Sequence, residues 1–236
     1  MDADTEGDAC HGRELGAQGI GLCRTEHMFF QPSALRAMRQ MILARDDHSR
    51  ARALSRVLPI QREEFKSIFR EMAGLPVTIR LLDPPLHEFL PSECGEIEQL
   101  AEATGLGLLR IQRRLEALRE ANPMMGLRGC RLGIMFPEIY ESQVRALMAA
   151  CRQARKQGIQ PHVDIMLPLI SSASEVSILR ERLEPIVTED ARQSIGIGAM
   201  IETPRACLRA RTHAVRARTR GRVLMHGAPP RHDTLQ

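Results

Sequence analysis

Charged side chains stand where several apolar segments of this chain begin or end. In chain order they are Arg24, Glu26, Arg80, Asp83, Arg128 and Glu202. Arginine is planar, permanently charged and able to donate two parallel hydrogen bonds, so it matches a phosphate or a carboxylate. Mg²⁺ is usually held by one or two carboxylates together with substrate oxygens. If these side chains meet, they suit a small, doubly charged anion beside a metal ion, where an enolate is stabilised as a proton leaves the neighbouring carbon.

Each of these residues also has a purely structural interpretation, because a charged residue at a strand end often forms a salt bridge that only supports the fold. His27, close to Arg24, has two interpretations, a catalytic histidine and a hydrogen-bonded structural one, and the structural one is favoured. Cys23 has apolar neighbours and is expected to be a buried, unreactive thiol. The six cysteines show no CxxC or Cys/His ligand spacing. We therefore expect no zinc site and a reducing compartment.

The segments that must position these groups alternate between two patterns. Short apolar runs typical of buried strands lie at 19–23, 77–82, 130–136, 164–170 and 195–201. Apolar residues at helical spacing predict helices at 33–57, 61–73, 95–104, 106–121, 137–157 and 172–183, with another that begins at residue 204. Strands that alternate with helices predict βαβ units in a parallel sheet. The sequence therefore predicts an α/β fold, either a (β/α) barrel or a doubly wound sheet.

Two observations favour the barrel. Neither a GxGxxG loop nor a GxxxxGK[ST] loop is found in the sequence, so nucleotide-binding loops of those kinds are not expected. Polar groups instead follow the ends of several different strands, which is how (β/α)8 barrels build sites at one mouth. We therefore expect a TIM-type barrel with parallel strands.

Composition limits the class of protein. Of the 236 residues, 43% are hydrophobic and 26% are charged, as in soluble globular proteins. No apolar run approaches the ~18 residues that a membrane span needs, and the first residues do not resemble a secretory signal, so we expect a cytoplasmic protein. Aromatic residues make up only 3% of the chain. This disfavours nucleic-acid modules that stack bases on aromatic rings.

The net charge of +4 hides a division within the chain. Residues 205–236 contain eight arginines and one acid, while the rest carries 25 basic and 28 acidic groups. Three explanations for the basic end stay open. The first is a frameshift or a wrongly assigned gene end, which the 31 arginines against 2 lysines favour. The others are a basic tail that binds nucleic acid and an ordinary solvated helix.

Four long blocks of sequence carry a resemblance. They are GIGLCRTEHMFF at 19–30, IRLLDPPLHEFLP at 79–91, NPMMGLRGCRLG at 122–133 and MIETPRA at 200–206. In content and order they resemble the C-terminal PEP/pyruvate-binding domain of the pyruvate, phosphate dikinase family. PEP synthase and phosphotransferase enzyme I share the barrel of that family. Their versions of these blocks differ around Asp83 and Glu26, so these two enzymes are alternatives of lower rank.

The resemblance implies a fold and a function. It implies an α/β barrel that uses Mg²⁺ and interconverts pyruvate and phosphoenolpyruvate with ATP and phosphate. It also implies a homodimer and a phosphohistidine domain that carries the phosphoryl group. Matched residue by residue, Arg24 and Arg80 would bind the substrate, and Glu202 would bind both Mg²⁺ and the substrate. Asp83 and Arg128 match motif positions near the substrate, so they join the two arginines as candidate catalytic residues.

The chain also departs from the pattern of that family. The family's ATP-binding and phosphohistidine domains have no counterpart in this sequence, and the resemblance stops after Arg205, before the family's Asn-Asp pair and later cysteine. We therefore expect a fragment cut at both ends. Residues 1–206 would form an incomplete (β/α)8 barrel whose last strands are missing, and 207–236 an off-pattern, Arg-rich tail that is disordered or frameshifted. This chain is expected to be inactive alone, and a non-catalytic partner subunit of a full-length dikinase is the remaining alternative.

Overall fold

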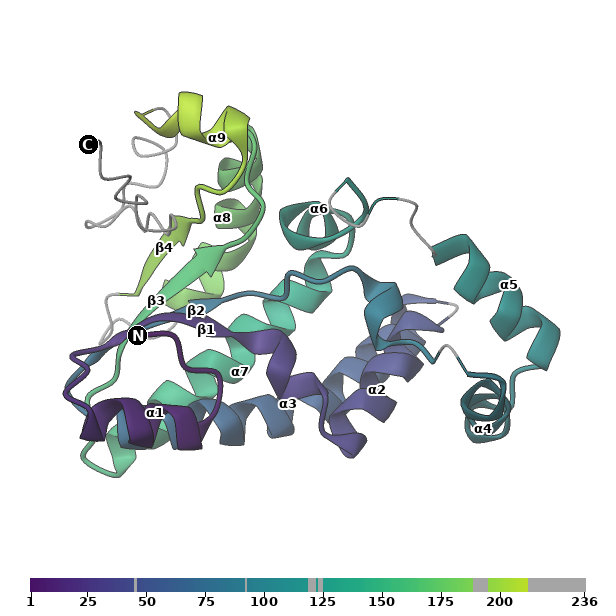
Figure 1. Ribbon diagram of the computed structural model, residues 1–236, viewed down its shortest axis with the longest axis horizontal. Helices are drawn as coiled ribbons and strands as arrows, with labels where there is room; N and C mark the ends of the chain where they lie inside the picture. The colour runs from purple at the N-terminus through teal and green to yellow at the C-terminus, as the bar shows by residue number, and fades with distance from the viewer. Residues whose placement is uncertain (45, 92, 119–121, 123–124, 189–194, 212–236) are drawn as a thin grey trace, which may run out of the picture.

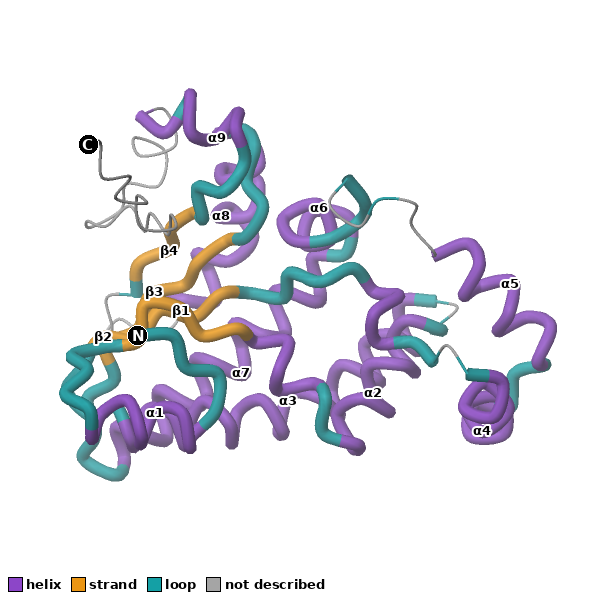
Figure 2. Tube along the Cα trace, in the orientation of Figure 1, coloured by secondary structure: helices purple, strands orange, loops and turns teal. Residues whose placement is uncertain are grey.

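The computed structural model describes the chain in six stretches: residues 1–44, 46–91, 93–118, 122, 125–188 and 195–211. Among these residues, four strands form one parallel sheet in the order β1-β2-β3-β4. The strands are β1 (Ile20–Arg24), β2 (Pro76–Arg80), β3 (His162–Leu167) and β4 (Gly196–Ala199). Figure 2 shows them as four adjacent orange segments.

The described part of the chain also contains nine α-helices and two 3₁₀ helices. The α-helices are α1 (Glu6–Glu14), α2 (Pro32–Ile42), α3 (Asp47–Glu71), α4 (Cys94–Thr104), α5 (Leu108–Leu118), α6 (Gly129–Met135), α7 (Pro137–Lys156), α8 (Ala173–Thr188) and α9 (Pro204–Leu208). The 3₁₀ helices are η1 (Thr25–Phe29), which directly follows β1, and η2 (Leu86–Phe89).

The strand order distinguishes the two folds that alternating strands and helices allow, a (β/α) barrel and a doubly wound sheet. Each strand pairs with the next strand along the chain, whereas a doubly wound sheet reverses its order at a switch point. Helices α1, α3, α7 and α8 accordingly lie along one side of the sheet (Figure 1). The doubly wound alternative is therefore wrong for the described residues. The fold is consistent with part of a barrel, but four strands do not close one, and no closed barrel is seen in these stretches.

The two faces of the sheet have different roles. Alternate strand residues, such as Val77, Ile79 and Ile165, belong to the main core that the helices also build. Residues of the opposite face, Leu22 and Met166, form a separate small cluster with Met200. Arg80 is the register partner of Met166, and partners in a parallel sheet share a face. Arg80 therefore lies on the face away from the core helices.

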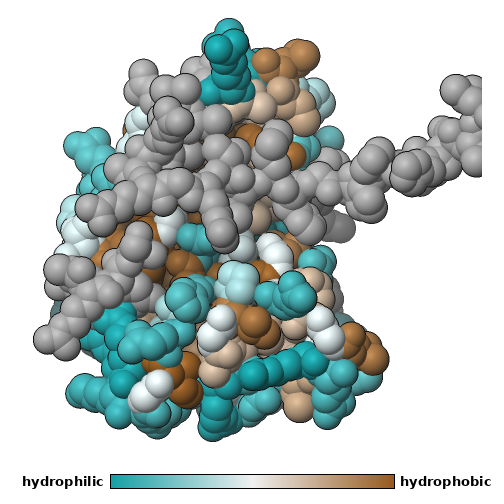
Figure 3. All heavy atoms as spheres, turned by 90° about the vertical axis from the view of Figure 1, so that its left-hand side faces the viewer, coloured by the Kyte–Doolittle hydropathy of each residue, from teal (hydrophilic) through white to brown (hydrophobic). Residues whose placement is uncertain are grey.

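Helix α1 covers the core with a polar outer surface. Ala9 is its one buried residue, and its first and last turns carry acidic and basic side chains. Figure 3 views the molecule from this side, and hydrophilic residues (teal) dominate its lower part, with smaller brown areas of apolar residues among them. Outside this core, α4 and α5 project away from the sheet at the right of Figure 1.

Most of the predicted elements are confirmed, but the strand predicted at 130–136 is wrong. This segment is helix α6, whose buried residues Gly129, Cys130, Leu132 and Gly133 follow helical spacing. A short apolar run cannot be assigned to a strand or a helix by its pattern alone. The helix packs closely against α7, since a Cβ on Gly133 would lie 2.5 Å from the ring of Tyr140.

The predicted helices at 33–57 and 61–73 also have different limits. The structure places a break after Ile42 and then continues α3 through Pro59 as one helix of 25 residues. A proline inside a helix removes one hydrogen bond and usually kinks or ends it. In α3 the buried face continues past this point from Val57 to Phe65 and packs along α7. Tertiary packing therefore overrides the local preference.

Two further expectations concern the chain as a whole. None of the described helices is both long and apolar enough to cross a membrane. Helix α9 spans the expected boundary at residue 206. Residues 212–236, most of the expected tail, lie outside the described residues. The division at 206 and the nature of the tail therefore stay predictions.

Cysteine burial provides a direct test of this fold. Cys23, Cys130 and Cys151 are buried, whereas Cys94 and Cys207 are exposed. Burial raises the pKa of Cys130 to about 12, and it also raises that of Cys23. Because the thiolate is the reacting species, iodoacetamide at pH 8 is expected to alkylate the three exposed cysteines, Cys10, Cys94 and Cys207, before the buried ones, as measured by peptide mass spectrometry. Equal rates for Cys23 and Cys207 in the native chain, and not only in denaturant, would contradict the described core.

Candidate functional site

The carboxyl ends of the strands are tied together by backbone hydrogen bonds. The Gly129 amide donates to the Asp83 carbonyl at 2.9 Å, and the Cys130 amide donates to the Pro168 carbonyl at 3.1 Å. The Met200 amide donates to the Leu167 carbonyl at 2.9 Å. At one edge of the sheet, the segments that follow β2 and β3 therefore meet the start of α6, and the segment that follows β4 meets the end of β3.

Helix α7 fixes the chain just before Asp83. Two side chains of α7 bind both polar backbone groups of Leu82. The Tyr140 hydroxyl donates to the Leu82 carbonyl at 2.9 Å, and Gln143 Oε1 accepts from the Leu82 amide at 2.9 Å. The amide nitrogen of Gln143 in turn donates to Thr25 Oγ1 at 3.0 Å. Buried Tyr140 and Gln143 thus join the ends of β1 and β2, and they set the position from which the Asp83 carboxylate projects.

Four charged side chains, three of them buried and Arg128 half-buried, form a network at this edge. Arg80 Nη2 donates to Glu26, and Arg80 Nη1 lies 3.2 Å from Asp83 Oδ2. Arg128 binds the same carboxylate with both arms, at 2.8 Å from Nη2 to Oδ2 and 3.3 Å from Nε to Oδ1. Arg80, Glu26 and Asp83 are 8%, 6% and 2% exposed. At that depth charges must be paired, and here two arginines balance two carboxylates.

The network is not fully satisfied. Arg80 Nε and Glu26 Oε2 are buried and have no hydrogen-bond partner among the described residues. A buried polar atom without a partner costs about 1–3 kcal/mol. These two atoms therefore mark a place where a ligand, a water molecule or a small rearrangement would lower the energy.

Two left-handed backbone positions allow the segments to approach. Gly129 has φ +54°, and a Cβ there would lie 2.7 Å from Leu169 Cβ and 3.0 Å from Asp83 Oδ1. Leu169 has φ +59°, which is strained for a residue with a side chain. Its amide donates to Glu202 Oε1 at 2.6 Å. The strained turn thus aims an N–H group at the glutamate.

Glu202 lies near the network without forming an ion pair with any described cation. Partial burial raises its pKa, and the charge of Asp83 adds to this effect. The Leu169 amide, Arg80 and Arg128 act in the opposite direction. These mutual electrostatic effects place Glu202 in the same neighbourhood as the two arginines and Asp83.

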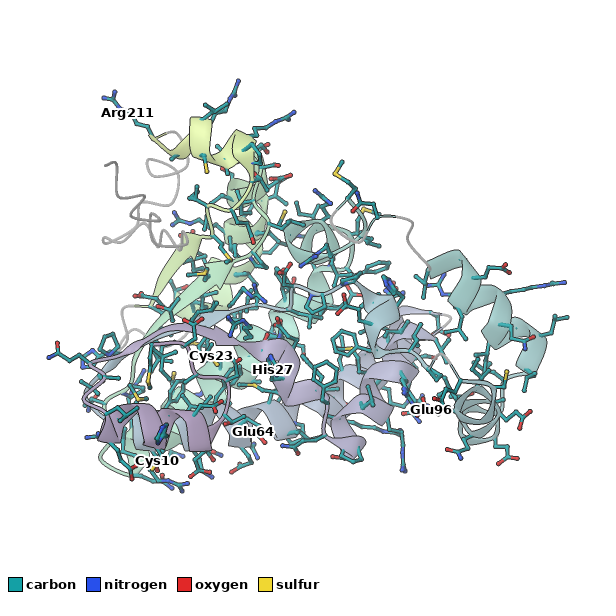
Figure 4. All side chains as sticks on the ribbon, in the orientation of Figure 1. Cys10, Cys23, His27, Glu64, Glu96 and Arg211 are labelled. Carbon is teal, nitrogen blue, oxygen red and sulfur yellow. The ribbon has the colours of Figure 1, made fainter. Side chains whose placement is uncertain are left out.

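Arg24 has separate partners. It is the register partner of Arg80, yet its guanidinium binds the N-terminal segment, at 3.0 Å from Asp2 Oδ2 and 3.1 Å from Asp4 Oδ2. His27 Nε2 lies 3.5 Å from the same Asp4 oxygen. Figure 4 labels His27 on the segment after β1 and Cys23 on β1 itself. Arg24 and Arg80 thus stand on adjacent strands, but their guanidinium groups share no ion-pair partner.

The structure therefore brings together Arg80, Asp83, Arg128 and Glu202, and it places Arg24 beside them on β1. Glu26 was grouped with these residues in the sequence but given no role, and it proves to be the buried partner of Arg80. The sequence held no signal for Asp4, because its importance depends on the N-terminal segment pairing with β1 at Leu22.

A Mg²⁺ ion fits this donor set only in part. Among the described residues, no group of three or more histidine, cysteine or acidic side chains is arranged to hold a metal. Glu202 could offer one carboxylate, since only its Oε1 receives a hydrogen bond. Both oxygens of Asp83 already bind arginine. Glu202 is therefore the one predicted site residue available as a metal ligand, and the other ligands would come from a substrate or from elsewhere.

This parallel α/β sheet, with arginines and carboxylates at its carboxyl edge, agrees with what sequence comparison finds. The family model of PEP-utilising enzymes, PEP-binding domain, matches residues 1–218. The chain belongs to this family.

Its relatives include pyruvate, phosphate dikinases. It is 48% identical to that of Rhizobium meliloti (strain 1021) over 218 residues, which are 90% of this chain and 24% of the relative. It is 49% identical over 215 residues to the chloroplastic pyruvate, phosphate dikinase 1 of Oryza sativa subsp. japonica, covering 87% and 23%. It is 46% identical over 213 residues to the enzyme of Giardia intestinalis, covering 88% and 24%. The chain thus spans about a quarter of the length of these relatives.

The dependence of Arg80 on Glu26 can be measured as stability. Glu26→Gln removes one of the two charges that compensate a buried guanidinium, and breaking a buried pair in this way costs about 3 kcal/mol. We expect the free energy of unfolding, from urea denaturation, to fall by about that amount. Glu181→Gln, at an exposed position of α8, is the matched control and should change it by less than about 0.5 kcal/mol. Equal effects of the two variants would contradict the network.

Proposed function

We propose that this chain carries part of the pyruvate and phosphoenolpyruvate site of a pyruvate, phosphate dikinase. The reaction would interconvert pyruvate, ATP and phosphate with phosphoenolpyruvate, AMP and diphosphate. The observation that carries the proposal is the pair Arg80 and Arg128 converging on Asp83, with Glu202 beside them, at the carboxyl edge of a parallel sheet. Sites of (β/α) barrels lie at this edge.

Charge balance limits how a substrate could bind at this network. Arg80, Arg128, Glu26 and Asp83 together are neutral, so a substrate with two or three negative charges would have to displace a carboxylate or arrive with a cation. Arg80 keeps one unpartnered N–H group, at Nε, and Arg24 lies on the adjacent strand with its side chain 34% exposed. These two arginines would bind the carboxylate and the phosphoryl group of the substrate. Their fixed positions would stabilise the charge that develops during transfer.

Mg²⁺ is part of the proposal through Glu202. When bound, the ion would neutralise negative charge on the enolate oxygen of pyruvate. The chain's own contribution is to hold the Glu202 carboxylate in place, through the Leu169 amide at 2.6 Å and through the Thr203 hydroxyl, which donates to the Ile170 carbonyl at 3.1 Å. Asp83 would orient Arg80 and Arg128, because its two oxygens bind both.

The proposal has further parts that follow from the family. A phosphohistidine domain would deliver the phosphoryl group, the enzyme would be a cytoplasmic homodimer, and residues 1–206 would be the barrel portion. The alternatives are another PEP-utilising barrel enzyme, of the PEP synthase or enzyme I type, and a non-catalytic partner subunit of a full-length dikinase. The experiments below distinguish them.

A chimera tests the site. Residues 1–206 would replace the aligned segment of the Rhizobium meliloti enzyme, and pyruvate- and phosphate-dependent AMP formation from ATP would be measured. We expect activity in the chimera, and a loss of about 100-fold or more in kcat/KM for Arg80→Gln or Arg24→Gln, because each donor to a developing charge is worth about that factor. Arg145→Gln, at an exposed position of α7, should stay within about twofold.

Four results would contradict parts of this proposal. Full activity of both site variants would show that the anion site is wrongly assigned. Activity only when residues 1–206 replace the aligned segment of a PEP synthase, and not of the dikinase, would favour the PEP synthase alternative. A folded chimera without activity would favour the non-catalytic alternative. AMP formation by the 236-residue chain alone would overturn the expectation that it is inactive.

The metal role of Glu202 is tested in the same chimera. Glu202→Gln keeps the hydrogen bond from Leu169 but removes the charge. Changes in the outer shell of a metal already cost about tenfold, so loss of a direct ligand should raise the Mg²⁺ concentration for half-maximal rate by at least that factor. Glu181→Gln, which removes the same charge from an exposed position of α8, is the control and should leave the Mg²⁺ dependence unchanged. An unchanged Mg²⁺ dependence would remove Glu202 from the ligand set.

A further inference from the structure

Two adjoining hollows lie between the turn that joins α2 to α3 and the pair α4–α5. Their volumes are about 430 and 440 Å³, which is the size range of sites for small molecules. Both are lined by Leu43, Ala44 and Leu106, so they form one continuous depression with two lobes. None of its lining residues belongs to the candidate functional site.

The lining of this depression is strongly cationic. Its described lining includes six arginines: Arg50, Arg110, Arg113 and Arg114 in one lobe, and Arg52 and Arg56 in the other. Among the residues that the structure describes, no acidic side chain lines either lobe. A concave surface with one sign of charge concentrates its own field and attracts counter-ions. The arrangement therefore selects for anions.

Three of these arginines have no compensating charge. Arg110, Arg113 and Arg114 are exposed and form no ion pair with any residue that the structure describes. They lie at positions i, i+3 and i+4 of α5, so they share one helix face, where like charges repel. A bound anion would relieve this repulsion, since arginine donates parallel hydrogen bonds to phosphate oxygens.

The other three arginines of the depression already have polar partners, and the nearby acidic side chains bind other groups. Arg50 lies 2.6 Å from Glu138 and 3.4 Å from Asp47. Asp46 caps α3 by accepting the Ser49 amide at 2.7 Å. In the second lobe, Arg52 contacts His48 and Arg56 donates to Gln40, at 2.8 Å each, without a carboxylate. The lobe with Arg110 therefore has the highest uncompensated charge.

An apolar base supports the cationic face. Ile111 of α5 is fully buried and packs with Leu43 and Leu100 in a small cluster separate from the main core. This contact places α5 against the end of α2 and turns its arginines towards the depression. The second lobe adds the side chains of Gln40, Ser49 and Thr104, which can hydrogen-bond to hydroxyl groups.

We propose that this depression binds a small organic anion with two or more phosphate groups. The phosphates would lie in the lobe of Arg110, Arg113 and Arg114, and the hydroxylated organic part would lie beside Gln40 and Ser49. A single phosphate would bind more weakly, because it engages fewer of the three uncompensated arginines. The inference does not depend on the proposed dikinase function, since it shares no residue with that site.

The test uses the 236-residue chain and inorganic tripolyphosphate, followed by titration calorimetry at low and high salt. We expect binding at one site, weakening with salt as electrostatic contacts are screened, and at least about tenfold weaker binding of inorganic phosphate, equal to about 1.4 kcal/mol. Fructose 1,6-bisphosphate tests the organic part and should compete with tripolyphosphate. Absence of tripolyphosphate binding to the folded chain would overturn the proposal.

Matched variants locate the site. Arg110→Gln with Arg114→Gln should weaken tripolyphosphate binding about tenfold or more. The control, Arg36→Gln with Arg145→Gln, removes the same charge from exposed positions outside the depression and should change it by less than about twofold. Ala44→Phe fills the wall shared by both lobes without changing charge, and it should also abolish binding.

Three outcomes would refute the assignment. One is an equal loss in the pocket variant and the control, which would show attraction by net charge alone. Another is unchanged binding in both Ala44→Phe and the arginine variant. The third is a single-stranded oligonucleotide that binds more tightly than tripolyphosphate and depends on the same arginines, which would identify a nucleic-acid surface. Circular dichroism confirms that each variant is folded.

Discussion

Burial of the Arg80 guanidinium is the constraint on which the rest of the site depends. A charge at 8% exposure is tolerated only beside opposite charges, and its partners come from two directions. Glu26 is supplied by the 3₁₀ helix that follows β1, and Asp83 by the chain after β2. The register of β1 with β2 and the clamp of α7 on Leu82 are therefore required together. If either shifted, a buried charge would be left without a partner.

The winding of the sheet explains why these groups meet. With every strand paired to the next and the covering helices on one side, the other face is free to carry polar side chains such as Arg80. The carboxyl ends of β2, β3 and β4 then lie at one edge, where Gly129 and Leu169 take left-handed conformations so that backbones can touch. Local strain at functional edges is common, and it is offset by the packing around it.

The arginines at the sheet edge and the arginines of α5 are in opposite electrostatic states. At the sheet edge each arginine is paired, Asp83 is shared, and a substrate must exchange partners or bring a cation. On α5 the three arginines face a depression whose described lining contains no acidic side chain. Paired, buried arginines favour selectivity at a cost in binding energy, whereas uncompensated, exposed ones favour rapid capture of anions. The same residue type thus serves two different kinds of recognition.

The sequence by itself determined the alternation of strands and helices, the parallel sheet and the identity of the charged residues at strand ends, because these follow from local periodicity and residue type. It misjudged 130–136 as a strand, because a short apolar run fits either a strand or a helix. It also divided α3 at Pro59, because packing along α7 overrides the local preference of proline. Only the tertiary structure pairs Glu26 with Arg80 and Asp4 with Arg24. It also packs α5 against the end of α2. Partners 54 and 20 residues apart are joined by chain packing, which no local pattern encodes.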